Sequence, residues 1–211
     1  MTVEIPDHFS VEPVEPADFR DLQEFFKQLI AAHQRKNMLS KQEARGQLGL
    51  IANKRIAGVF KNIDRAALVL CLLSDRLRKP GSEKILDYYG YVIRNDDDKV
   101  IGISTLEQEP DPRLSDDYGK PRGRIPELAE MTMYMLPQNM RGGDMPATSV
   151  EVGQVVMSKA RDLGFEKLEA VVSLDNGPSR WHFRELGFVQ TSQTKEAPKP
   201  LGTRILFKAT L

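Results

Sequence analysis

The sequence predicts a single mixed α/β (α+β) domain, a central mixed sheet flanked by helices. Some segments repeat apolar residues at helical spacing, whereas others alternate them strictly, and the two kinds of segment are interleaved along the chain. Such interleaving is typical of a sheet with helices packed on its faces. A length of 211 residues fits one domain, so residues 1–211 are expected to form one unit.

The composition argues against several classes of function. The 30 basic and 30 acidic residues cancel, so the chain lacks the basic footprint of a nucleic-acid partner. The longest apolar run, residues 66–73, is far shorter than the roughly 20 residues that span a membrane. The N-terminus carries no export signal. We therefore expect a cytoplasmic protein with neither a nucleic-acid nor a membrane partner.

No metal site is predicted. The single cysteine, Cys71, lies inside the apolar run 66–73 and is expected to be a buried small residue. The acidic turn Asp96–Asp98 lacks the alternating ligands, central glycine and distal glutamate of a calcium loop. These aspartates are expected to be solvated.

The first half of the chain is expected to form a strand, two helices and a hairpin. Residues 9–14 alternate like a half-buried strand, and residues 19–33 place apolar side chains on one helical face. Residues 40–43 have the composition of a capping box, which predicts a second helix from about residue 41. The run 66–73 fits either a buried helix or a buried strand, and we favour the helix. Two β-rich runs, 85–94 and 100–106, flank an Asx-rich turn typical of a hairpin.

Residues 110–126 are predicted to be a long loop, because they are rich in Pro, Asp, Arg and Gly. Three arginines in it, Arg113, Arg122 and Arg124, suggest an acidic acceptor substrate. The alternative, a solvated surface loop, is the more common structure.

The second half begins with a strand at residues 128–136. Its residues alternate strictly, with Glu130, Thr132 and Tyr134 on one face and the methionines on the other. Apolar spacing from Val152 to Leu163 predicts a helix that ends at Gly164. The remaining elements are expected to be a strand, a short helix and two closing strands, at residues 168–174, 179–186, 188–192 and 203–211.

The turn between the first strand and helix of this half has the features of an anion site. A helix N-terminus offers unpaired amides and a partial positive charge, and small residues let a phosphate approach the backbone. Counting forward from Pro137 places Arg141, Gly142 and Gly143 in this turn, whereas counting back from Gly164 places Ala147 there. The two registers stay open. Asp144 would disfavour a phosphate and fits a helix cap.

This part of the chain resembles the GNAT superfamily of N-acyltransferases. Met133-x-Met135-x-Pro137 resembles the strand that enters the family's acyl-CoA site, and Asn176 precedes Gly187-Phe188 at the family's usual spacing. The earlier elements also follow the family's order, although only residues 128–188 carry motifs. The resemblance implies a GNAT-like acyl-CoA N-acyltransferase fold. It also implies transfer of an acyl group, most often acetyl, from acetyl-CoA to the primary amine of a small molecule or protein.

The resemblance also implies a set of cofactor-binding residues. A backbone amide in the segment 133–136 would polarise the thioester carbonyl, and Asn176 would hold the pantetheine arm or the splayed strands. Phe183 stands where many members place the tyrosine that protonates the leaving thiolate, and it cannot donate a proton. Closing strands in such folds often pair, so a homodimer is one expected assembly. The full set is Met133, Met135, Arg141, Gly142, Gly143, Ala147, Asn176 and Phe183.

Catalysis requires a base, because the attacking amine must be neutral. Glu130 is our first choice, since it lies on the strand beside the implied cofactor, although such carboxylates are as often structural. Tyr134 and His182 are the candidates for the missing proton donor, although a histidine in the position of His182 is more often a helix-surface or packing residue. Trp181 is expected to fill the core rather than contact the cofactor.

Two other functions remain open. The degenerate phosphate turn and Phe183 also fit a GNAT-fold module that binds acyl-CoA or regulates without catalysis. An acyl-homoserine-lactone synthase shares the fold, but its characteristic N-terminal Arg and Trp pattern is not evident here.

Overall fold

The computed structural model describes residues 9–37, 88–110, 124–136, 148–174, 176–196 and 203–211. The helices are a short 3-10 turn (Pro16–Asp18), α1 (Phe19–Asn37), α4 (Thr148–Asp162) and α5 (Gly177–Glu185). The strands are β1 (Phe9–Pro13), β2 (Tyr88–Asn95), β3 (Val100–Pro110), β4 (Arg124–Met135), β5 (Lys167–Ser173), β6 (Val189–Glu196) and β7 (Thr203–Thr210). The predicted helix from residue 41, the run 66–73 and the turn 137–147 lie outside the described residues.

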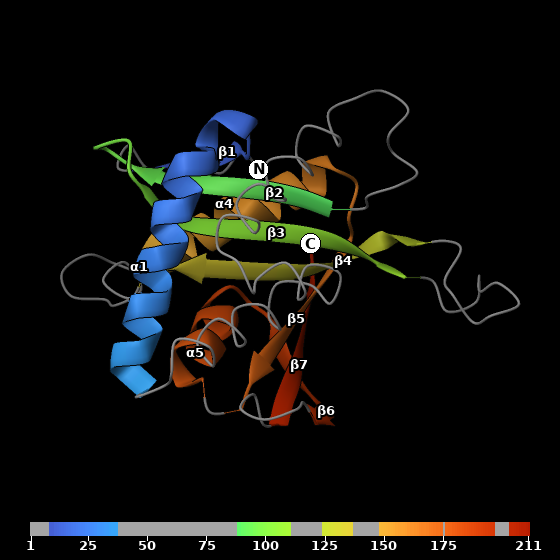
Figure 1. The fold of residues 1–211 in the computed structure, drawn as a ribbon. Helices are drawn as coiled ribbons and strands as arrows, with labels where there is room; N and C mark the ends of the chain where they lie inside the picture. The colour runs from blue at the N-terminus through green and yellow to red at the C-terminus, as the bar shows by residue number, and fades with distance from the viewer. Residues whose placement is uncertain (1–8, 38–87, 111–123, 137–147, 175, 197–202) are drawn as a thin grey trace, which may run out of the picture.

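The strands form one 7-stranded mixed sheet in the order β1-β2-β3-β4-β5-β7-β6. Every neighbouring pair is antiparallel except β4 and β5, which are parallel. Figure 1 shows α1 crossing the front of the sheet and α4 lying behind it. The predicted mixed sheet flanked by helices is therefore confirmed.

Both faces of β4 are covered, and the predicted alternation explains how. Ala129, Met131 and Met135 are buried in the same apolar cluster as α4 residues such as Val152 and Val156. The opposite face carries Tyr134 and Leu136, which are also buried. This second face is the one that α1 crosses, and α1 contributes its own buried row: Leu22, Phe25, Phe26 and Leu29.

α4 ends next to the stop signal that the sequence indicates. Gly164, the predicted stop of α4, has a φ of 88°, a left-handed conformation that favours glycine, and its N–H donates to the carbonyl of Arg161. Among the residues that the structure describes, no helix combines the length and apolar character needed to cross a bilayer.

Three strands are longer than predicted, and the first of them, β3, runs to Pro110 instead of Leu106. β4 begins at Arg124, which we had placed in a loop, because Arg124 pairs with Pro110 beyond an irregularity between Gln108 and Pro110. The Ile125 carbonyl also accepts a hydrogen bond from Gln108 Nε2 at 3.1 Å. β6 extends to Glu196 instead of Ser192, across an irregularity between Gln190 and Thr194. The extensions of β3 and β6 are mostly polar, and that of β4 has one aliphatic residue, Ile125, so no apolar alternation marks them in the sequence.

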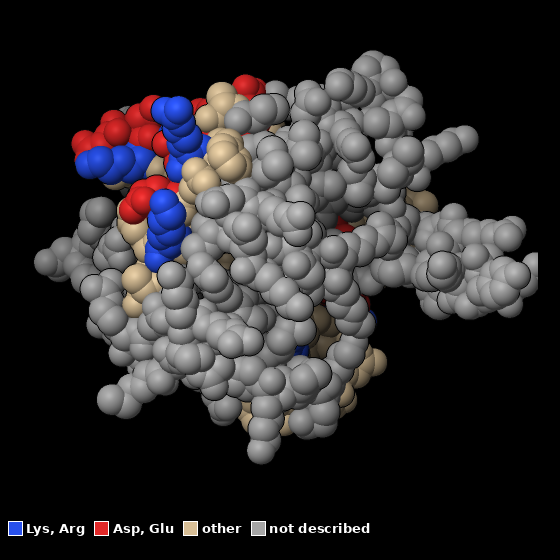
Figure 2. Space-filling model, viewed as in Figure 1, with Lys and Arg blue, Asp and Glu red and all other residues tan. Residues whose placement is uncertain are grey.

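An ion-pair cluster fixes the start of α1 to the β2–β3 hairpin. Arg94 donates to Asp18 Oδ1 at 2.8 Å and to the backbone carbonyl of Asp98 at 2.7 Å, and it also pairs with Asp21 at 2.9 Å. Asp18 Oδ2 in turn accepts from the amide of Glu15 at 2.7 Å. Acidic and basic side chains gather over this corner of the molecule (Figure 2). We call Arg94, Asp18, Asp21 and Asp98 the Arg94 cluster.

Candidate active site

The parallel strands β4 and β5 part near the middle of the sheet. They pair only from Leu128–Lys167 to Glu130–Glu169. Beyond that point residues 131–135 and 170–173 diverge, and Figure 1 shows the two arrows pointing in different directions. We call these two segments the fork. It corresponds to the strand splay that the GNAT resemblance implies.

The backbone of β4 presents hydrogen-bond donors to the fork. The amide of Leu136 donates to the carbonyl of Ile101 on β3 at 3.0 Å. Backbone groups alternate in direction along a strand, so the amides of Met133 and Met135 point away from β3. Among the described residues these two amides have no partner on β5, because the ladder ends at Glu130.

Both helices on the α4 side of the sheet begin close to the fork. α4 and α5 follow β4 and β5 in the chain, and both start at the carboxyl ends of these strands. Asn176 caps α5, because its Oδ1 accepts from the amide of Ser179 at 3.2 Å and its own amide donates to the Ser173 carbonyl at 3.0 Å. Asn176 therefore joins the end of β5 to α5, and its predicted contact with pantetheine stays a prediction.

A row of carboxylates crosses the other face of the sheet at the base of the fork. Glu130 on β4 lies directly opposite Glu107 on β3 and is in register with Glu169 on β5, so the three side chains share one face. Lys208 on β7 pairs with Glu169 at 2.6 Å. Glu130 is half-buried, and Tyr134, on the same face, is buried.

The aromatic residues of α5 differ in their surroundings. Phe183 is buried, with its ring centroid 5.1 Å from that of Phe188 and 6.3 Å from that of Phe207. Trp181, which we had expected in the core, is 45% exposed, so that prediction is wrong. The core-facing side of this short helix is already occupied by His182, Phe183 and Leu186, and Trp181 falls on the opposite side.

His182 is the most unusual polar residue of this region. It is only 2% exposed, and neither ring nitrogen has a hydrogen-bond partner among the described residues. Burial lowers its pKa to about 4, so the ring is neutral at neutral pH. The sequence offered no sign of this isolation, because helical spacing predicts burial but not the absence of a partner.

The structure brings together some of the predicted site residues. Met133, Tyr134 and Met135 lie along β4 in the fork, and Glu130 lies at its base. Asn176 caps α5, and Phe183 lies within that helix. Arg141, Gly142, Gly143 and Ala147 lie outside the described residues, as do Arg113 and Arg122. The choice between the two registers of the phosphate turn therefore stays a prediction.

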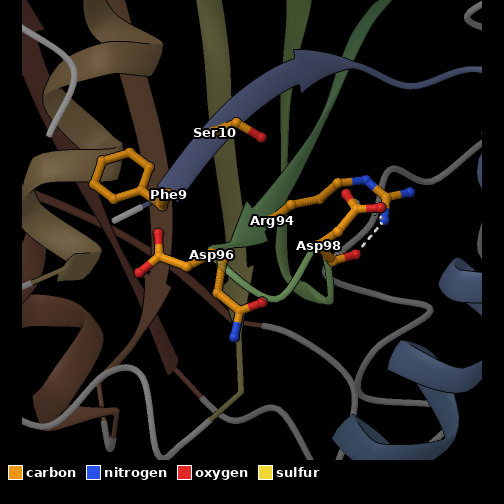
Figure 3. Close-up of a pocket in the computed structure, with 6 residues that line it drawn as sticks. Phe9, Ser10, Arg94, Asp96 and Asp98 are labelled. Carbon is orange, nitrogen blue, oxygen red and sulfur yellow. Dashed lines mark hydrogen bonds and ion pairs between the residues drawn. The ribbon is translucent and has the colours of Figure 1, made fainter. Parts of the chain in front are cut away.

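A surface pocket near the β1 edge of the sheet is a poorer candidate. It is lined by Phe9, Ser10 and the hairpin residues Arg94, Asn95, Asp96 and Asp98. Figure 3 shows Arg94 reaching toward Asp98 rather than standing free to meet a ligand. β1 and β2 are separated from the fork by β3, so this pocket does not belong to the same site.

Comparisons with known proteins agree on the fold. No protein-family model matches the sequence, and no curated protein does. Among solved structures, ribosomal-protein-S5-alanine acetyltransferase from Vibrio fischeri is similar over 100% of this chain and 97% of its own, with a TM-score of 0.61 and 15% identity. Spermidine N-acetyltransferase from Vibrio cholerae, in complex with CoA and spermine, is similar over 97% of this chain and 96% of its own, with a TM-score of 0.58 and 11% identity. The microcin C7 self-immunity acetyltransferase MccE, in complex with acetyl-CoA and AMP, is similar over 98% of this chain and 94% of its own, with a TM-score of 0.61 and 9% identity.

Proposed function

We propose that this chain, which has the fold of the GNAT acetyltransferases, transfers an acetyl group from acetyl-CoA to a primary amine. The observation that carries the proposal is the fork, where β4 and β5 part and two amides of β4 are left without a strand partner among the residues that the structure describes. Structural neighbours crystallised with CoA or acetyl-CoA support acyl-CoA as the donor.

The fork suits an extended ligand that contains amide groups. Unpaired amides and carbonyls at a strand edge bind an extended chain as an added strand would be bound. The pantetheine arm of CoA is such a chain, since it carries two secondary amides between the thioester and the phosphates. In the proposed complex, the amides of Met133 and Met135 receive two carbonyl oxygens of acetyl-CoA, one from an amide of the pantetheine arm and one from the thioester of the acetyl group.

The chemistry needs little beyond this arrangement and a base. Glu130 takes a proton from the acceptor's ammonium group, and the neutral amine attacks the thioester carbon. An amide of β4 stabilises the oxyanion that forms. The carbon–sulfur bond then breaks, the attacking nitrogen gives up its second proton as the new carbon–nitrogen bond becomes an amide, and the thiolate of CoA leaves and takes up a proton. Tyr134, on the same face of β4 as Glu130, is our candidate donor of that proton.

Replacement of Glu130 by Gln tests the base. We expect kcat to fall by about 100-fold, because a positioned base typically contributes that much, while the affinity for acetyl-CoA stays unchanged. The deficit should shrink as the pH rises, since more of the amine is then neutral without help. Thiol release and calorimetry measure the two quantities.

The matched control is Glu107→Gln, which removes the carboxylate directly opposite on β3. An equal loss of kcat in both variants would mean that the negative charge of the carboxylate row matters, rather than a proton transfer by Glu130.

Tight acetyl-CoA binding with no thiol release toward any amine would instead favour the second candidate function, a module that binds acyl-CoA without catalysis. Phe183 favours that candidate, since it occupies the position at which many GNAT members have a tyrosine that donates the proton.

Phe183→Tyr distinguishes the two functions from the other direction. If acyl transfer is slow for want of a proton donor, the added hydroxyl should raise kcat, by up to about tenfold. The buried hydroxyl should also cost about 1 kcal/mol of stability unless it finds a partner. Steady-state rates and denaturant unfolding of the same preparation check both effects. An unchanged rate in a folded variant would show that the missing donor does not limit the reaction.

A further inference from the structure

We propose that His182 contacts the bound acyl donor, with its imidazole N–H donating a hydrogen bond to an oxygen of the pantetheine arm or of the pyrophosphate. The inference rests on the proposed function, because it requires acyl-CoA at the fork. It adds to that function a ligand-positioning residue on α5, at the position before Phe183.

The packing of α5 on α4 shows which way His182 faces. Leu186 packs closely on Gly153 of α4. A Cβ atom added to Gly153 would lie 2.5 Å from Leu186 Cδ1. His182 precedes Leu186 by one helical turn, so it lies on the same side of α5, facing α4. One turn before Gly153 on α4 is Ser149, which is also buried.

The two helices run in the same direction, which decides where His182 lies along them. α4 returns from the end of β4 to the start of the parallel β5. α5 likewise returns from the end of β5 to the start of β6, because β5 and β6 are both antiparallel to β7. One turn back from the Leu186–Gly153 contact therefore leads toward the N-termini of both helices. His182 lies between α4 and α5 on the side of the fork.

The missing partners of His182 require an explanation. A neutral imidazole has one donor and one acceptor, and both are buried without a partner among the described residues. Buried polar groups are nearly always hydrogen-bonded, so an isolated one near the N-terminal turn of α4 indicates a ligand that completes it. The first-turn amides of α4 lie at the level of Ser149 and favour acceptor oxygens in the same place.

Calorimetry with CoA on wild type, His182→Leu and His182→Gln tests the inference. We expect Leu to weaken CoA binding by about tenfold, and Gln, which keeps an N–H donor, to restore most of the affinity. Thermal unfolding without ligand should show that the Leu variant is no less stable than wild type, since it removes an unsatisfied polar group. A histidine with only a structural role would not combine weaker CoA binding with unchanged or higher stability of the free protein when it is replaced by Leu.

Two fragments identify the acceptor. If His182→Leu loses affinity only for pantetheine, the acceptor is an amide carbonyl. If it loses affinity only for the nucleotide fragment of CoA, the acceptor is a phosphate oxygen. Either result supports the inference. A shift of the imidazole N–H signal in NMR on adding CoA to wild type provides a test that needs no variant. Equal CoA affinity of wild type and the Leu variant, with an unmoved imidazole signal, would overturn the inference and leave the proposed function standing. A wild type that binds no CoA would overturn both.

Discussion

Replacement of Arg94 by Met should lower the free energy of unfolding by about 3 kcal/mol, because it leaves a nearly buried carboxylate without its partner. The side chains of Arg94 and Asp18 are 12% and 11% exposed, and their atoms are 2.8 Å apart. Burial alone would lower the pKa of the Arg94 guanidinium, but hydrogen bonds to Asp18 and Asp21 raise it on balance. Urea unfolding measures the loss.

The controls separate the buried pair from the exposed one. Asp98→Asn removes a carboxylate that is 87% exposed and 3.5 Å from Arg94, so it should change stability by less than about 0.5 kcal/mol. Asn also tolerates the positive φ of 59° at this position. The double variant Arg94→Met with Asp18→Asn should lose less than the sum of the two single variants. Full additivity would show that the pair contributes nothing.

The Arg94 cluster illustrates what local sequence patterns do not contain. The hairpin, the helix from Phe19 and the turn at residues 95–98 follow from alternation, helical spacing and Asx residues, which act over a few positions. The pairing of Arg94 with Asp18 joins residues on separate elements, and nothing in either segment indicates the other. Asp18 is an acidic residue at the start of a helix, and it also anchors the hairpin.

The same distinction applies to the candidate site. Glu130, Met133 and Tyr134 could be placed on one strand because alternation assigns them to faces, and the fork agrees with the splay that the GNAT resemblance implies. The row that Glu130 forms with Glu107 and Glu169 depends on register across three strands, which single-strand patterns do not set. The exposure of Trp181 was missed for a similar reason, since a short helix leaves its outer side to whichever residue falls there.

His182 should make the protein less stable in acid. The folded-state pKa of about 4 lies below the ordinary value of 6.5, because burial disfavours the charged ring. Between these values the unfolded chain binds a proton that the folded chain does not, so stability falls as the pH drops from about 6.5 to about 4. A shift of this size corresponds to about 3 kcal/mol.

Unfolding by urea at several pH values across this window checks the expectation, with His182→Leu and His182→Gln as paired variants. Neither variant titrates, so the difference in stability between wild type and each variant should change by about 3 kcal/mol from neutral to acidic pH. Leu and Gln differ in polarity, so a change common to both reports the proton and not the packing. Parallel pH profiles in all three proteins would contradict a neutral, buried His182. If the His182 ring donates to a phosphate of bound CoA, binding should raise the pKa of His182. The loss of stability on acidification should then be smaller in the complex than in the free protein.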